Sequence, residues 1–279
     1  MKTFIRLSLV VTASYLALVT ADVVHAAGAR TELELRDFSP IFKKANVQGT
    51  FVLVDGQTGR TLRYNPERAQ KRFLPASTYK IPNSLIAMET GVATGPDFTL
   101  KWNSTVAPRQ SWWATVWGQD HTLKTALPNS VVWYYQELAR RVGPERMQSY
   151  VDRFRYGNQN ITGGIDRFWL TGGLRISAEE QVDFLRRFYS GKLGVSERTT
   201  RTVKELLVLE QTPQYRLSGK TGWAGLGDPS VPEVGWFVGY LERDERVHFF
   251  AINIDIMKNE DAAARLSVTK AILRDLGLI

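Results

Sequence analysis

Short runs of β-branched and aromatic residues lie near both ends of the chain and predict strands. Towards the N-terminus, residues 47–54 form one run, and a turn over residues 55–59 leads into a second run that ends at Tyr64. In the last third of the chain, further runs cover residues 215–223, 235–241 and 247–256. Because the strands come from both ends of the chain, we expect them to join in one antiparallel sheet.

Between these runs, apolar residues recur at the spacing of helices. Ser177 and Glu180 form a capping box, which predicts a helix that runs to Tyr189. Another helix is expected to begin near Ala76 with a short, 3₁₀-like first turn, because Pro82 interrupts regular helical bonding. Further helices are predicted over residues 31–44, 122–142, 145–155, 195–209 and 262–276.

Strands at both ends and helices between them predict an α+β fold. We expect a single domain over residues 27–279, in which helices flank an antiparallel sheet lobe (about 27–75 and 210–279) and an all-helical lobe (about 76–209) is inserted. A cleft between the two lobes is the expected place for a site. The length of 279 residues and a composition of 43% hydrophobic and 23% charged residues agree with a globular domain.

The first 26 residues have the pattern of a secretory signal peptide. Lys2 and Arg6 precede an apolar run over residues 7–21, and Ala26 supplies the small residue that signal peptidases prefer. The apolar run is short for a membrane span. We therefore expect residues 1–26 to be removed and the mature chain to be periplasmic, without stable membrane insertion.

Charge and residue usage exclude several classes of function. The net charge is +8, but lysine and arginine are scattered among acidic residues without a long basic run, which argues against nucleic-acid binding. A chain with three histidines and no cysteine nearly excludes a zinc site with several such ligands. A Ser-His-Asp triad would have to use His121 or His248, which are expected in a polar loop and a strand. An enzyme with serine as nucleophile and lysine as base survives this elimination.

Ser77 and Lys80 are the candidate nucleophile and base. Residues three apart share a helical face, so the hydroxyl and the amine would lie side by side at the start of the helix near Ala76. Serine needs such a base because its hydroxyl is a poor nucleophile at neutral pH. Ser267 and Lys270 have the same spacing, so this pattern alone does not decide between the two pairs.

Four further motifs follow Ser77 and Lys80 in a fixed order. They are Ser130-Val131-Val132, Tyr156-Gly157-Asn158, Trp169-Leu170 and Lys220-Thr221-Gly222. Each is common alone, but the ordered set resembles the class D (oxacillinase-type) serine β-lactamases of the penicillin-recognising serine enzyme superfamily. The resemblance covers essentially the whole mature chain. One small departure is Tyr79, which stands where the family more often has phenylalanine.

The resemblance implies that β-lactams are the substrates. Ser77 would attack the amide carbonyl, and the backbone N–H groups of Ser77 and Trp223 would stabilise the oxyanion. Ser130 and Lys220 would relay a proton to the departing ring nitrogen. Substrate-binding residues would be Thr221, Gly222, Trp223, Arg265, Val132 and Leu170, of which Thr221 and Arg265 would bind the substrate carboxylate. Tyr156, Gly157 and Asn158 would be structural.

The resemblance also implies a modified lysine at position 80. Burial against Val132, Trp169 and Leu170 would lower the pKa of Lys80, which is otherwise protonated at neutral pH. The neutral amine of class D enzymes takes up CO₂, supplied as bicarbonate, to form a carbamate. Lys80 is therefore expected to be N6-carboxylated, hydrogen-bonded by the Trp169 indole, and to act as general base in acylation and deacylation. No metal or other cofactor is implied.

Two other functions are compatible with the same motifs. A penicillin-binding sensor domain and a D,D-peptidase would both be acylated without efficient turnover of the β-lactam. The sequence leaves open the preference among oxacillin, late cephalosporins and carbapenems, on which the loop over residues 224–234 bears. Inhibitor sensitivity and the choice between monomer and homodimer are also open.

Overall fold

The structure is a computed structural model that describes residues 33–111, 113–226 and 232–279. The expected signal peptide and the middle of the loop over residues 224–234 lie outside the described residues. The described residues belong to one compact unit, Thr31–Ile279. Among its described helices, none is long and apolar enough to span a bilayer.

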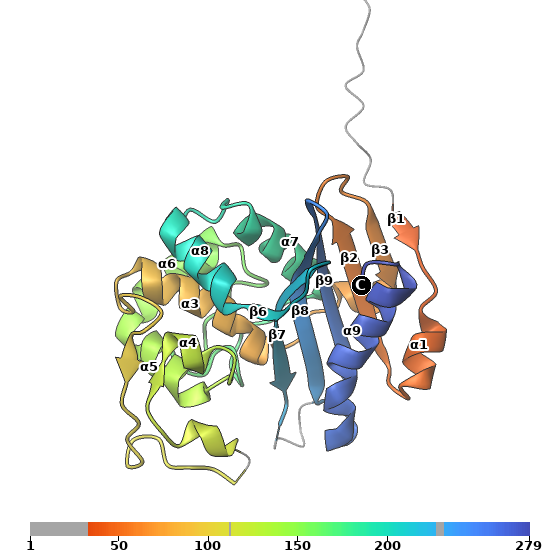
Figure 1. Ribbon diagram of the computed structural model, residues 1–279. Coiled ribbons are helices and arrows are strands. Elements are labelled where there is room, and N and C mark those ends of the chain that lie inside the picture. Colours follow the sequence, from red (N-terminus) through yellow and green to blue (C-terminus); the bar gives the residue numbers. More distant parts are fainter. Residues whose placement is uncertain (1–32, 112, 227–231) are drawn as a thin grey trace, which may run out of the picture. The chain divides into compact units, whose positions relative to one another are not determined.

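A seven-stranded sheet, in the order β1-β3-β2-β9-β8-β7-β6, runs through this unit (Figure 1). Its neighbouring strands pair antiparallel except β1 and β3, which are parallel. The strands are β1 Leu33–Leu35, β2 Gly49–Asp55, β3 Thr61–Tyr64, β6 Val208–Gln211, β7 Arg216–Ala224, β8 Val234–Arg243 and β9 Arg246–Asp255. The prediction of an α+β fold with an antiparallel sheet from both chain ends is confirmed.

The helices cover both faces of the sheet and fill the space beside it (Figure 1). Helix α7 contacts β2, β8 and β9, whereas α9 contacts β8, β9 and α1. Beside the sheet, α3 contacts α5, α6 and α8. The helices are α1 Ser39–Lys44, α2 Pro66–Gln70, α3 Lys80–Glu89, α4 Leu123–Ala126, α5 Val132–Val142, α6 Pro144–Arg153, α7 Ala178–Tyr189, α8 Glu197–Leu206 and α9 Ala264–Asp275. Short elements are η1 Ala76–Tyr79, η2 Thr115–Trp117, η3 Asn259–Ala263 and the strand pair β4 Thr99–Leu100 with β5 His121–Thr122.

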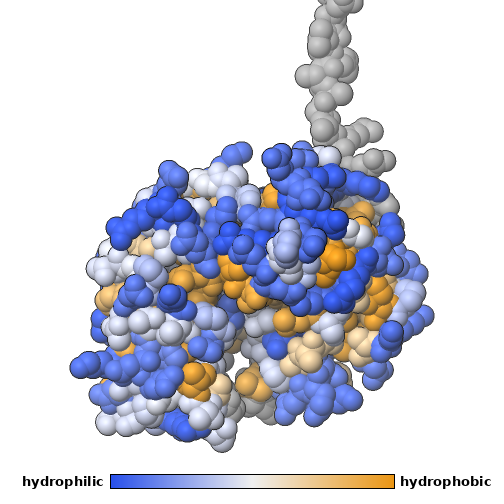
Figure 2. All heavy atoms as spheres, viewed as in Figure 1, coloured by the Kyte–Doolittle hydropathy of each residue, from blue (hydrophilic) through white to orange (hydrophobic). Residues whose placement is uncertain are grey.

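Successive residues of the central strands face two different cores, because side chains alternate across a sheet. On β2, Val52 and Val54 belong to the core that α7 and the other helices share. Phe51 and Leu53 belong to the second core, with α1 and α9. Hydrophilic residues cover most of the face seen in Figure 2, and hydrophobic residues show along the junction between the helical elements and the sheet.

Three predicted helices are wrong in part, and tertiary context explains each difference. Residues 33–35 form β1, because the edge of β3 offers a pairing partner, and the helix begins only at Ser39. The helix predicted over residues 122–142 is broken between α4 and α5, where Ser130 has a left-handed φ of 57°. The helix predicted over residues 195–209 ends at Leu206, after which β6 pairs with β7.

Candidate active site

The predicted nucleophile lies on a 3₁₀ turn that continues directly into α3. Lys80 Nζ donates a hydrogen bond to Ser77 Oγ at 2.7 Å. Ala76, just before Ser77, has a left-handed φ of 46°, a conformation that an alanine adopts only when its surroundings impose it. Its N–H donates to the Trp169 carbonyl at 3.0 Å, which helps to impose that geometry. The short 3₁₀-like first turn was predicted correctly.

Lys80 is 1% exposed, which makes its amine unusual for a lysine. Burial lowers the pKa of Lys80 well below its ordinary value, and the positive charge of Lys220 lowers it further. Among the described residues, no carboxylate forms an ion pair with Lys80; the Tyr135 ring lies 5.4 Å from Nζ. The environment therefore favours a neutral amine beside Ser77, which can accept a proton.

Trp169 is fully buried next to the same turn. Its ring stacks on Tyr79, with centroids 5.4 Å apart and planes 25° apart. The indole Nε1–H finds no hydrogen-bond partner among the described residues. An unpaired buried donor costs about 1–3 kcal/mol, so its presence calls for an acceptor at this place.

Strand β7 lies directly against the nucleophile turn. A Cβ at Gly222 would be 3.0 Å from the Pro75 carbonyl oxygen and 3.1 Å from Thr78 Cγ2, so a side chain here would push β7 and the nucleophile turn slightly apart. Lys220 on the same strand is 4% exposed and donates to the Thr221 carbonyl at 2.9 Å. Burial, and then the charge of Arg265, lower the pKa of Lys220 to about 7. The Lys220-Thr221-Gly222 motif thus joins the Ser77 turn in space.

Arg265 reaches the same strand from the first turn of α9. Its Nη1 donates to the Gly222 carbonyl at 2.7 Å, and its Nε donates to the Ala262 carbonyl at 2.6 Å. The guanidinium lies 5.7 Å from the centroid of the Trp223 ring. Burial lowers the pKa of Arg265 to about 10, so it is still cationic at neutral pH.

Ser130 lies in the break between α4 and α5, half-buried. Its side chain makes no hydrogen bond to another described residue, so its hydroxyl is available to a ligand. Val132 begins α5, the helix that packs against α3. Leu170 is half-buried against the core that contains Trp169.

The Tyr156-Gly157-Asn158 motif is linked to the nucleophile turn by buried hydrogen bonds. Tyr156 donates to Gln181 Oε1 at 3.3 Å, and Gln181 Nε2 donates to Thr78 Oγ1 at 2.8 Å, all within the buried core. A Cβ at Gly157 would meet the carbonyl of Arg175 at 2.1 Å. Asn158 donates to the Gly173 carbonyl and accepts from Arg175 N–H, closing the loop.

Sequence reasoning missed Gln181 as part of this site. A polar residue on the buried face of the α7 pattern was the available signal, but nothing local indicated its partner.

The alternative candidates for nucleophile and base do not lie in this site. Ser267 is exposed on α9, and Lys270 pairs with Glu210. His121 was expected in a polar loop, but it is buried on β5, where it bonds to Thr125 and to the Val116 carbonyl. No group of His, Asp or Glu within the described residues could hold a metal.

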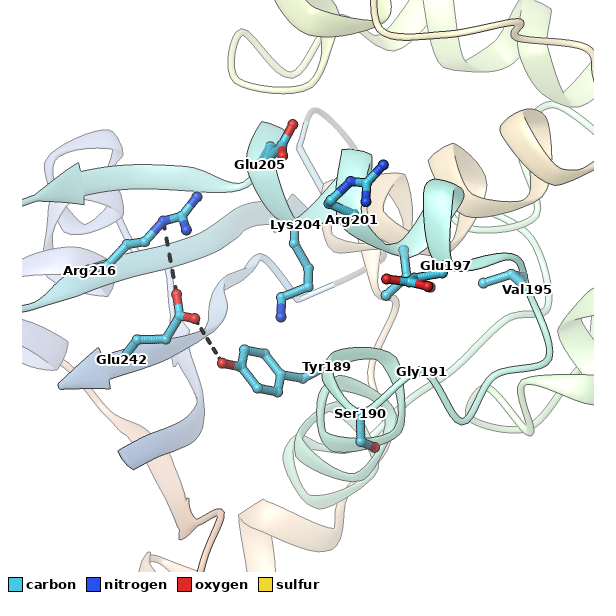
Figure 3. Close-up of a pocket in the computed structure, with 11 residues that line it drawn as sticks. Tyr189, Ser190, Gly191, Val195, Glu197, Arg201, Lys204, Glu205, Arg216 and Glu242 are labelled. Atoms are coloured by element: carbon cyan, nitrogen blue, oxygen red, sulfur yellow. Dashed lines mark hydrogen bonds and ion pairs between the residues drawn. The ribbon is translucent and has the colours of Figure 1, made fainter. Parts of the chain in front are cut away.

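A cavity of about 490 Å³ lies away from Ser77, between the end of α7, helix α8 and strands β7 and β8 (Figure 3). At its floor, Glu242 accepts from the Tyr189 hydroxyl at 2.8 Å and lies 3.9 Å from Arg216. Lys204 stands over the Tyr189 ring, 3.5 Å from its centroid. Acidic and basic groups are mixed in this lining, so it does not select a ligand class.

Comparison with known proteins shows which family the chain belongs to. The family described as "Penicillin binding protein transpeptidase domain" matches residues 49–276. β-Lactamase OXA-10 of Pseudomonas aeruginosa is 40% identical over 279 residues, covering 100% of this chain and 99% of that protein. A crystal structure of a class D β-lactamase from Nostoc superimposes with a TM-score of 0.82 at 42% identity, covering 87% of this chain and 99% of the other.

The chain belongs to the class D serine β-lactamases. Enzymes of this family hydrolyse β-lactams, and the resemblance inferred from the motifs is confirmed. A more distant relative, the regulatory protein BlaR1 of Bacillus licheniformis, is 34% identical over 248 residues, which are 89% of this chain and 40% of that protein.

Proposed function

We propose that this class D enzyme hydrolyses β-lactam antibiotics through an acyl-enzyme on Ser77, and thereby confers antibiotic resistance. The observation that carries the proposal is the 2.7 Å hydrogen bond between Ser77 Oγ and the buried amine of Lys80. A serine beside an uncharged base is the arrangement that nucleophilic catalysis requires.

Each proposed step is assigned to a side chain or backbone group of this site. Ser77 attacks the lactam carbonyl, and the N–H groups of Ser77 and Trp223 stabilise the oxyanion. Ser130 and Lys220 deliver a proton to the ring nitrogen as the C–N bond breaks; a lysine with a pKa of about 7 exchanges protons readily at neutral pH. Thr221 and Arg265 bind the substrate carboxylate, for which a guanidinium provides paired donors.

The surroundings of Lys80 fit carboxylation by CO₂. The lowered pKa of Lys80 favours the neutral, nucleophilic amine, and the buried Trp169 Nε1–H finds no acceptor among the described residues. A carbamate at Lys80 would supply an anionic oxygen base beside Ser77. Trp169 would then donate its free hydrogen bond to that group and hold its orientation, and the low exposure of Lys80 would keep bulk water away.

Export and quaternary state belong to the same proposal. Residues 1–26 direct the chain to the periplasm, where the mature enzyme acts as a monomer or homodimer on β-lactams that enter the cell envelope.

A mixing experiment tests the proposed function against its two alternatives. The purified protein is mixed with excess chromogenic cephalosporin or penicillin in bicarbonate buffer, and product is followed beyond one equivalent. Sustained turnover supports the hydrolase, whereas one stoichiometric burst supports a sensor domain or D,D-peptidase; the BlaR1 relative is the specific reason to test for a sensor. Ser77→Ala is expected to lose covalent labelling by penicillin. Labelling that survives this change would overturn the assignment of the nucleophile.

A further inference from the structure

The β7–β8 hairpin beside the site contains an acid–aromatic pair that none of the motifs includes. Trp223 Nε1 donates a hydrogen bond to Glu233 Oε2 at 2.7 Å. Trp223 is paired with Gly235 in the ladder between β7 and β8, and Glu233 immediately precedes β8. The Glu233 carboxylate therefore reaches across the end of the hairpin to hold the indole, and its charge strengthens the bond.

The backbone of Glu233 is itself fixed. Its carbonyl accepts a hydrogen bond from Ile256 N–H at 3.0 Å, just past the end of β9. Because the main chain of Glu233 is anchored next to β9, its carboxylate starts from a fixed Cα position, and its hydrogen bond restrains the indole of Trp223.

The indole of Trp223 in turn lies beside the side chain of Arg265. The guanidinium lies 5.7 Å from the indole centroid, and the aliphatic part of the side chain packs so closely on Gly235 that a Cβ there would be 2.8 Å from Arg265 Cδ. Nε and Nη1 of Arg265 are used by backbone carbonyls. Among the described residues, nothing accepts a hydrogen bond from Nη2, so this group is available to a substrate carboxylate.

We propose that Glu233 is a positioning residue for the substrate carboxylate: it holds the Trp223 indole, and the indole holds the guanidinium of Arg265. This inference rests on the proposed function, in which Arg265 binds that carboxylate. The backbone of Trp223 is positioned by the pairing of β7 with β8, in which Trp223 lies opposite Gly235, so oxyanion stabilisation does not depend on the Glu233 side chain. Loss of the Glu233 side chain should therefore raise KM and leave kcat nearly unchanged.

Two substitutions at position 233 separate the hydrogen bond from the charge. Glu233→Ala removes the acceptor and is expected to raise KM for a penicillin about fivefold, with kcat within about twofold of the unmodified enzyme. Glu233→Gln retains an oxygen that can accept from the indole, so KM is expected to return close to its original value.

Glu242→Ala is the matched control. Glu242 also accepts a hydrogen bond from an aromatic side chain, the Tyr189 hydroxyl, but it lies near the other end of β8 (Figure 3). Its removal is expected to leave KM unchanged.

The methyl ester of the same penicillin decides whether Glu233 acts through carboxylate binding. The ester has no carboxylate for Arg265, so Glu233→Ala and the unmodified enzyme are expected to give equal KM values for it. Equal KM increases for acid and ester, a fall in kcat, or no change in KM for the acid would each overturn the inference.

Failure of the proposed function would be visible separately. If the unmodified protein does not turn over β-lactams, the concentration dependence of Ser77 acylation still reports substrate affinity and tests Glu233. If it turns over normally but Glu233→Ala has no effect on KM, only the inference about Glu233 fails.

Discussion

Replacement of Trp169 by phenylalanine removes one N–H donor from the site and keeps an aromatic ring where the indole stacks on Tyr79. The indole Nε1–H has no partner among the described residues, and it is completely buried. If carboxylated Lys80 is the acceptor that this donor requires, the substitution lowers the stability of the carbamate on Lys80.

The loss of one hydrogen bond to a charged group determines how far the affinity for CO₂ should fall. A hydrogen bond to a charged group contributes about 1.5–3 kcal/mol, which corresponds to a roughly ten- to hundredfold loss in affinity for CO₂. The bicarbonate concentration that gives half-maximal kcat should rise by the same factor. In buffer free of CO₂, where Lys80 carries no carbamate, the free energy of unfolding should change little, because loss of an unpaired donor returns about 1–3 kcal/mol and the smaller ring leaves a cavity of similar cost.

The assay is a bicarbonate titration of kcat in degassed buffer, and ¹³C NMR with labelled bicarbonate reports the carbamate independently of activity. Phe168→Leu is the control, because Phe168 also packs on Tyr79, with ring centroids 5.0 Å apart, but has no polar hydrogen. This control should lower stability and leave the bicarbonate midpoint unchanged. An unchanged midpoint in Trp169→Phe would refute the assignment of the indole to the carbamate.

Three further predictions follow from contacts at and around the site. Lys220 has a folded-state pKa of about 7 against an ordinary value of 10.5, so the folded protein binds fewer protons than the unfolded chain between these pH values. Its contribution makes the free energy of unfolding rise with pH by about 3 kcal/mol from about pH 7 to 9.5. Urea titrations of Lys220→Met should lack that rise. If the free energy of unfolding depends on pH equally in both proteins, the shifted pKa is contradicted. Gln181→Leu leaves the buried Tyr156 hydroxyl without its acceptor and should lower the free energy of urea unfolding by about 1–3 kcal/mol; full retention of stability would show that the bond is dispensable. Lys270→Ala and Ser267→Ala should leave kcat and KM unchanged in steady-state assays, and loss of turnover in either would mean that the wrong Ser-x-x-Lys pair was chosen.

Local sequence patterns determined those features that depend on neighbours along the chain. The capping box at Ser177 set the start of α7, because both of its hydrogen bonds close within three residues. Pro82 shortened the turn that carries Ser77, and the spacing of Ser77 and Lys80 put their side chains in contact. The order of the motifs also determined the family, since each motif is a short local signal.

Tertiary structure alone decided the features that depend on distant partners. Residues 33–35 and 208–211 became strands because β3 and β7 offered free edges, which local propensity does not register. The hydrogen bond from Gln181 to Thr78 spans 103 positions in the chain, and no residue near either one indicates the other. The pKa of Lys80 likewise depends on how completely distant segments exclude water from its amine, because desolvation is a property of the packed core and has no counterpart in the order of residues.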